Sequence, residues 1–84
     1  MLFKNEIFNE VQQIFVDMSD LVHDDVSLDC DLELDLDLFE LERIELAVCL
    51  EERFKIDISD NEVFEFDTVQ DIVDLVAIKL GVKE

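Results

Sequence analysis

The sequence has no proline, only one glycine and no serine-rich stretch, so it offers no flexible linker between domains. Its 84 residues are enough for one small domain, which typically buries about 60% of the surface that its unfolded chain exposes. Half of the residues are hydrophobic, which argues against disorder despite the high charge. We therefore expect residues 1–84 to fold as a single domain.

Residue types that carry enzymatic chemistry are also scarce. The only glycine, Gly81, cannot supply a phosphate-cradling loop. Cys30 and Cys49 form neither a CxxC pair nor a disulfide framework, and His23 has no second ligand at metal spacing. We interpret the cysteines as free, buried or half-buried thiols and the histidine as a solvated loop residue. Carboxylates are abundant but lack an accompanying base or nucleophile, so we do not expect an enzyme.

Basic residues are few, because 24 Asp plus Glu stand against 6 Lys plus Arg and give a net charge of −18. Nucleic acid and anionic membrane surfaces would repel such a chain. The longest apolar run, residues 46–50, is far too short to span a bilayer, and the N-terminus lacks the basic-then-apolar order of a secretory signal. We expect a soluble, cytoplasmic monomer that binds a basic protein surface and whose stability depends on salt.

Helical periodicity and capping signals predict an all-α bundle of three main helices and one short helix. Asp60 is a suitable N-cap for the short helix, Thr68 with Asp71 forms a capping box for the last one, and Gly81 is the expected left-handed stop. The predicted helices cover residues 3–18, 40–54, 61–65 and 69–80.

The helix predicted over residues 40–54 carries two apolar stripes, which lie on roughly opposite sides at about 100° per residue. The stripe that suits the core consists of Leu46, Ala47, Leu50 and Phe54. Leu41, Ile44 and Val48 form the other, which is edged by Glu45 and Glu52, with Glu42 and Glu51 further round the helix. Exposed apolar residues inside an acidic rim are typical of a docking surface for a basic, apolar-lined partner. Alternatively, the second stripe packs on the preceding loop or on the short helix, and the glutamates only solvate the surface.

Residues 26–38 alternate strictly, with apolar residues at the even positions and polar residues at the odd ones. A period of two is typical of a half-buried strand. No second alternating run is present to pair with it, so its backbone groups would lack partners in a sheet. We therefore interpret the segment as a long extended loop that packs its leucines over the bundle.

The same loop suggests a second class of function, calcium binding. Five acids occupy positions 1, 3, 5, 9 and 12 of a twelve-residue calcium loop, and these are Asp29, Asp31, Glu33, Asp37 and Glu40. Leu34 stands where such a loop needs glycine for its sharp turn, and any strictly alternating acidic segment meets this spacing by construction. We expect loose cation binding and no specific metal site.

Several segments resemble the acyl carrier protein family, in one register and without insertion from residue 35 to residue 80. Residues 37–41, DLFEL, stand where that family has the Gly-x-Asp-Ser-Leu motif that opens its partner-recognition helix. The other matching segments are EL at 45–46, LEERF at 50–54, IDI at 56–58 with Asp60, and TVQ at 68–70. The resemblance implies a small four-helix bundle with a long loop between helices I and II, and a partner among the enzymes that recognise acyl carriers.

Glu40 stands where the family's attachment serine is expected. In that family the serine hydroxyl takes up a 4′-phosphopantetheine arm, whose thiol carries acyl groups. A carboxylate would give at best a labile mixed anhydride, so the resemblance places the cofactor position at Glu40 and we expect it to remain unmodified. Phe39 replaces an acid beside this position and adds an aromatic to the front of the apolar stripe.

These observations lead to one main hypothesis and one alternative within the family. The main hypothesis is a carrier-like adaptor or regulator that docks a basic partner through the acidic helix and works without cofactor. The alternative is a genuine acyl carrier of fatty acid or polyketide-type synthesis, which would need an unusual attachment site.

Overall fold

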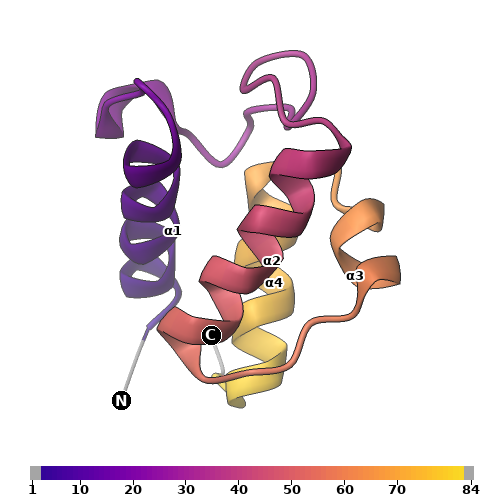
Figure 1. Ribbon diagram of the computed structural model, residues 1–84. Coiled ribbons are helices and arrows are strands. Elements are labelled where there is room, and N and C mark those ends of the chain that lie inside the picture. The colour runs from indigo at the N-terminus through magenta and orange to yellow at the C-terminus, as the bar shows by residue number, and fades with distance from the viewer. Residues whose placement is uncertain (1–2, 83–84) are drawn as a thin grey trace.

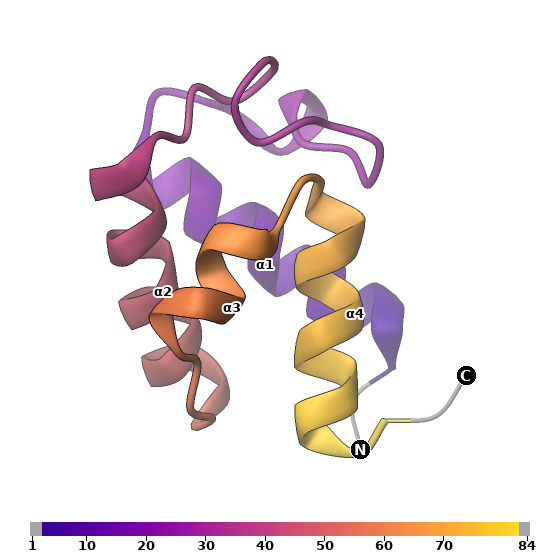
Figure 2. The ribbon, with the colours of Figure 1, turned by 90° about the vertical axis from the view of Figure 1, so that its right-hand side faces the viewer.

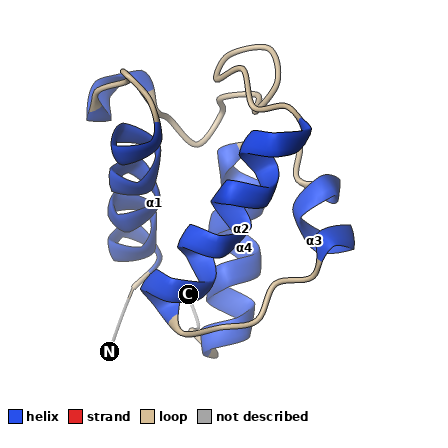
Figure 3. Ribbon diagram, viewed as in Figure 1, coloured by secondary structure: helices blue, strands red, loops and turns tan. Residues whose placement is uncertain are grey.

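The computed structural model describes residues 3–82, and in that range the chain is all-helical with no strand. The helices are α1 (Lys4–Met18), α2 (Glu40–Phe54), α3 (Asp60–Glu65) and α4 (Val69–Leu80), and a 3-10 turn η1 (His23–Asp25) follows α1. Figure 1 and Figure 3 show that the longest connection, between α1 and α2, lies across one end of the bundle. The predicted all-α bundle of three main helices and one short helix is confirmed.

One hydrophobic core lies between α1, α2 and α4, and Figure 2 shows α3 lying between α2 and α4. Each main helix contributes the stripe that its periodicity predicts. The buried helical residues are Ile7, Val11, Ile14 and Phe15 of α1, Leu46, Ala47, Leu50 and Phe54 of α2, and Val69, Ile72, Val73, Val76 and Ala77 of α4. Phe3, the first residue of the helix predicted over residues 3–18, instead precedes α1 as its N-cap and is exposed.

The ends of α3 and α4 follow local capping chemistry. Ser59, and not Asp60 as predicted, is the N-cap of α3, because its hydroxyl accepts the Glu62 amide while Glu62 accepts the Ser59 amide. The predicted pairing of Thr68 with Asp71 at the start of α4 is present. Gly81 ends α4 in the left-handed conformation, at φ 72°, as predicted.

The alternating segment 26–38 is an extended loop, and its backbone partner is the chain that enters α4. Leu32 N donates to Asp67 O at 3.0 Å, Val69 N to Cys30 O at 3.1 Å, and Gln70 N to Leu28 O at 3.0 Å. A single antiparallel bridge forms between Asp31 and Thr68. The loop is therefore fastened to the α3–α4 connection rather than to a second strand.

The inward alternation holds at Leu32, Leu36 and Leu38, which are buried, but not at Leu34, which is 84% exposed. A turn intervenes, because Asp35 N and Leu36 N both donate to Asp31 O. The chain reverses its course there, so the strict period of two no longer selects the buried face. None of the helices in residues 3–82 has the length and apolar character needed to cross a membrane.

Candidate functional site

The backbone that leads into α2 keeps a special conformation at Asp37. Its φ of 55° lies in the left-handed region, and this is the position where the resemblance places a glycine. Aspartate tolerates that region better than most residues. Leu38 then turns inward and its amide donates to Leu32 O at 2.7 Å. These contacts fix the entry into the helix, so that Glu40 is the first residue of α2 and is exposed.

The second apolar stripe of α2 faces solvent. Leu41, Ile44 and Val48 are 59%, 45% and 48% exposed, and Phe39 at the head of the helix is 57% exposed. These side chains keep about half of their surface in contact with solvent, so this stripe is not part of the buried core. The sequence predicts that these four apolar residues face a partner, and this stays a prediction. We call Phe39, Leu41, Ile44 and Val48 the outer face of α2.

The glutamates around the outer face divide into two kinds. The side chains of Glu45 and Glu52 are exposed and make no hydrogen bond or ion pair within the described part of the chain. Glu42 and Glu51 are half-buried: Glu42 accepts the Phe39 amide at 3.0 Å, and Glu51 accepts the Ile58 amide at 3.1 Å. Glu42 and Glu51 therefore also stabilise the two ends of α2, whereas the carboxylates of Glu45 and Glu52 are free in solvent.

Arg43 has a role that the apolar pattern does not predict. Its side chain is only 7% exposed, and its Nη1 atom donates to Val63 O at 2.9 Å and to Phe66 O at 2.7 Å. Its Nη2 atom lies 3.5 Å from Glu33 Oε1 in the loop. One guanidinium thus ties α2 to both ends of the last turn of α3. The only signal in the sequence is that Arg43 stands three residues before Leu46, on the core side of a helix.

Phe64 extends the outer face of α2 onto α3. It is 44% exposed and, with Phe39, lines an open hollow of about 380 Å³ beside Glu40. The buried Arg43 lies against the same hollow. The helix periodicity did not single out Phe64, because a six-residue helix is too short to show two stripes. Phe39 at the head of α2 and Phe64 on α3 thus place two exposed aromatic side chains beside Glu40.

The calcium-loop candidates do not form a metal centre in residues 3–82, where no group of three or more metal-ligating side chains is arranged around a common point. Asp31 instead closes a turn, since its Oδ1 atom accepts the amides of Glu33 and Leu34 at 2.9 and 3.0 Å. Asp37 lies in the loop and Glu40 on α2. Loose cation binding by the exposed carboxylates stays a prediction.

The two thiols are free and half-buried, as predicted. Cys49 lies on α2, where burial raises the pKa of its thiol above the ordinary value, and the neighbouring Glu52 carboxylate raises it further. A raised pKa leaves the thiol protonated at neutral pH, which is the opposite of what an activated nucleophile needs. His23 is exposed on η1, beside the amide oxygen of Gln13 at 3.0 Å.

The residues at the head of α2 do not fit the attachment of a phosphopantetheine arm. That attachment requires a hydroxyl, and Glu40 offers a carboxylate. No serine or threonine lies on α2. Ser59 and Thr68, which follow it in the chain, are occupied as the N-caps of α3 and α4. The start of α2 thus has the backbone conformation described above, but it lacks the hydroxyl to which the cofactor would be attached.

Comparison with known proteins gives a consistent result. Residues 9–76 match the family described as "Phosphopantetheine attachment site". The chain is similar to proteins named acyl carrier protein from Petrotoga mobilis (35% identical, 96% of this chain and 95% of that one) and from a Picosynechococcus species (38%, 90% and 94%). A third, from Borrelia garinii, is 35% identical over 92% of this chain and 96% of that one. This chain therefore belongs to the acyl carrier protein family.

Proposed function

We propose that this protein is a non-catalytic member of the acyl carrier protein family that docks a basic, apolar-lined protein partner through α2 and works without a phosphopantetheine arm. The observation that carries the proposal is the outer face of α2. It presents four exposed apolar side chains near the exposed carboxylates of Glu45 and Glu52, on a helix whose other side packs in the core.

The chemistry of the outer face suits a protein partner. Apolar side chains that are about half exposed lose their remaining contact with water when a partner covers them, which contributes about 25 cal/mol per Å² buried. The net charge of −18 attracts a basic surface over distances near the Debye length and speeds encounter. Phe39 and Phe64 add two aromatic side chains, and aromatics are enriched at the centres of interfaces. The outer face and Phe64 therefore form a candidate interaction surface.

The absence of an arm is supported by the chemistry of Glu40. Transfer of the arm from coenzyme A leaves a stable phosphodiester only when an alcohol attacks, and a carboxylate forms a reactive anhydride. An armless protein would act as an adaptor or regulator, with the partner enzyme recognising its surface. The cytoplasmic location and the monomeric state expected from the sequence stay predictions.

The alternative is a genuine acyl carrier with a variant attachment site. The observation that favours it is that relatives named acyl carrier protein align with more than nine-tenths of this chain. The two functions differ in whether a phosphopantetheine arm is covalently attached, so the mass of the intact protein distinguishes them.

The first test incubates the protein with coenzyme A and a broad-specificity phosphopantetheinyl transferase, followed by intact mass measurement. We expect no gain for the natural chain and none for Glu40→Gln. We expect a gain of one arm for Glu40→Ser, because the helix entry and the outer face that a transferase recognises are retained. A stoichiometric gain by the natural chain would defeat the armless proposal. If Glu40→Ser gained no arm, the result would count against recognition of the outer face of α2 by the transferase.

The second test concerns docking and uses a carrier-recognising enzyme with a basic surface in a binding assay. Charge reversal by Glu45→Lys with Glu52→Lys is expected to weaken binding, chiefly by slowing association. Ile44→Ser should weaken it by speeding dissociation. The matched control is Asp24→Lys with Asp57→Lys, which changes the net charge equally at exposed positions outside α2 and α3. Equal binding by the two double variants would refute the assignment of α2.

A further inference from the structure

The short helix α3 has no cap of its own at its C-terminus. Its C-cap, Phe66, is extended at φ −66° and ψ 127°, without the left-handed glycine that ends α4, and its last turn carries no basic residue. The last carbonyl groups of a helix lack partners within the helix, and a helix of six residues is not stable by itself. The position of α3 therefore depends on groups that other elements supply.

Arg43 of α2 supplies the missing cap. Its Nη1 atom donates to Val63 O, one of the last four carbonyl groups of α3, and to Phe66 O at the C-cap. A basic side chain that donates to the last carbonyl groups is a common way to end a helix, but here it comes from an earlier helix. Hydrogen bonds from a charged donor are stronger than those between neutral groups. The guanidinium therefore fixes the last turn of α3 on α2.

Phe64 lies between the two residues whose carbonyl groups Arg43 binds. Its neighbour Val63 is fully buried, whereas Phe64 is exposed and lines the hollow of about 380 Å³ with Phe39 and Glu40. A movement of the last turn of α3 would therefore move the Phe64 ring relative to the head of α2. Arg43 is almost fully buried, so it offers little surface of its own to a partner.

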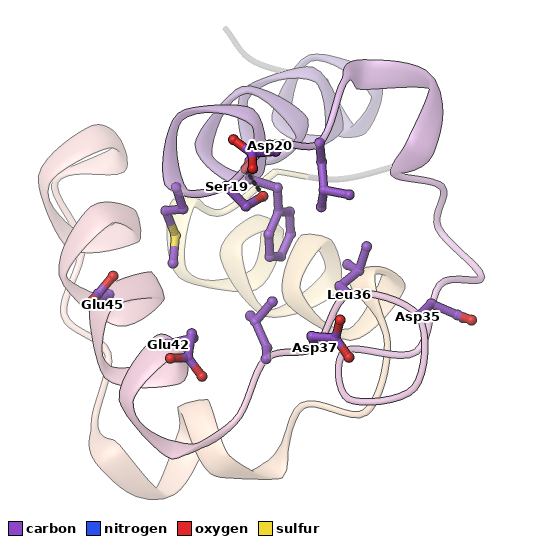
Figure 4. Close-up of a pocket in the computed structure, with 11 residues that line it drawn as sticks. Ser19, Asp20, Asp35, Leu36, Asp37, Glu42 and Glu45 are labelled. Carbon is purple, nitrogen blue, oxygen red and sulfur yellow. Dashed lines mark hydrogen bonds between the residues drawn. The ribbon is translucent and has the colours of Figure 1, made fainter.

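The start of α2 has different neighbours on its two flanks. On the flank toward α1, Glu42 and Glu45 line an open cavity of about 310 Å³ together with the end of α1 and the loop (Figure 4). On the flank toward α3, Glu40 lines its hollow together with the Phe64 ring. The outer face of α2 thus has carboxylates on one flank and an exposed aromatic side chain on the other, and the place of that aromatic depends on where α3 is held.

We propose that Arg43 is a positioning residue for docking, which holds Phe64 beside the head of α2 so that α2 and α3 offer the partner one composite surface. The role of Arg43 in docking rests on the proposed function, in which the outer face of α2 meets an apolar-lined protein. A surface that is ordered before binding loses less conformational freedom when a partner covers it. A fixed Phe64 ring therefore contributes more affinity than a mobile one, and loss of Arg43 weakens docking through Phe64.

A double-mutant cycle tests this coupling. Binding to an immobilised broad-specificity phosphopantetheinyl transferase is measured for the natural chain, Phe64→Ala, Arg43→Gln and the double variant. We expect Phe64→Ala to weaken binding roughly tenfold in the natural chain, but roughly threefold or less in Arg43→Gln, where the ring is no longer fixed. Ile44→Ser, on α2 itself, should weaken binding equally in both backgrounds. An equal effect of Phe64→Ala in both backgrounds would overturn the positioning role.

Two control backgrounds separate positioning from a general loss of stability or charge. Val11→Ala removes buried volume from α1, and Arg53→Gln removes the same charge from a part-exposed site on α2. Phe64→Ala should keep its full effect in both, and a reduced effect in Val11→Ala would assign the coupling to instability alone. Arg43→Lys keeps the charge but has a smaller, non-planar set of donors, so it should restore part of the coupling. It carries the same cycle should Arg43→Gln not fold.

Amide hydrogen exchange of the free protein tests the capping step without a partner. Arg43→Gln should speed exchange in α3 more than in α1, and an equal change in both helices would overturn the capping of α3 by Arg43. If Phe64→Ala leaves binding unchanged while Ile44→Ser weakens it, the positioning role fails and the proposed function stands. If neither variant changes binding, the proposed function fails, and the role of Arg43 in docking fails with it.

Discussion

Arg43 allows the sharpest test of how this bundle is held together. Replacement by methionine keeps much of the packing volume but leaves the carbonyl oxygens of Val63 and Phe66 without their donor. The two hydrogen bonds, at 2.9 and 2.7 Å, come from one almost fully buried charged group. Hydrogen bonds to charged groups contribute about 1.5–3 kcal/mol each, and orphaned buried acceptors carry a similar penalty. We expect Arg43→Met to lower the free energy of unfolding by about 3–5 kcal/mol.

That loss is large for a domain of this size, whose total stability is about 4–13 kcal/mol. Urea denaturation followed by far-UV circular dichroism measures it, and the melting temperature should fall by well over about 10 °C. The matched control is Arg53→Met, which removes the same charge from a part-exposed site. Arg53 pairs with Glu10 at 3.1 Å and with Asp17 at 3.5 Å on the surface, so its loss should cost about 1 kcal/mol or less. A cost below about 1 kcal/mol for Arg43→Met, or equal costs for the two variants, would refute this account of Arg43.

Three further predictions concern charge and protonation. Because the chain carries a net charge of −18, added sodium chloride should raise its melting temperature, and a fall with salt would contradict self-repulsion. Cys49 should react with iodoacetamide at neutral pH more slowly in the folded than in the urea-unfolded chain, because burial raises the pKa of its thiol; an equal rate would show an open site. The pKa of Glu62 is lowered, first by the hydrogen bond from the Ser59 amide and then by Lys79. Its contribution to stability is therefore present above its ordinary pKa and is lost as the pH falls through the lowered one. Ser59 amide exchange should lose protection relative to the rest of α3 over that acidic range, and Glu62→Gln should remove this pH dependence.

The helices are predictable from the sequence because their signals are local. The core stripes follow from spacing within each helix, and the exposure of Leu41, Ile44 and Val48 follows from the same geometry, since one helix in a small bundle cannot bury two opposite sides. The end of α4 at Gly81 is predictable because glycine alone adopts the left-handed conformation without steric cost. The outer face of α2 and the replacement at Glu40 are likewise predictable, because both depend only on residue types at positions along one helix.

Features that depend on distant segments are not predictable in this way. The carbonyl oxygens that accept from Arg43 lie 20 and 23 residues further along the chain, so no local sequence pattern predicts them. The partner of the alternating loop is the irregular connection before α4, which has no strand pattern of its own. The cavity between α1 and α2 needs both helices and the loop to exist at all. Ser59 is different: the Ser-x-x-Glu pattern was available, and Asp60 competed with it as an equally good capping residue type.

The fastening of the loop to residues 67–70 also bears on how the chain is made. Leu28, Cys30 and Leu32 lie about forty residues before their hydrogen-bond partners, so during synthesis these backbone groups emerge long before the segment that satisfies them. Until that segment is made, these backbone groups can form hydrogen bonds only with water. A nascent chain that ends before residue 67 therefore lacks the three backbone hydrogen bonds that fasten residues 28–32 to the rest of the fold.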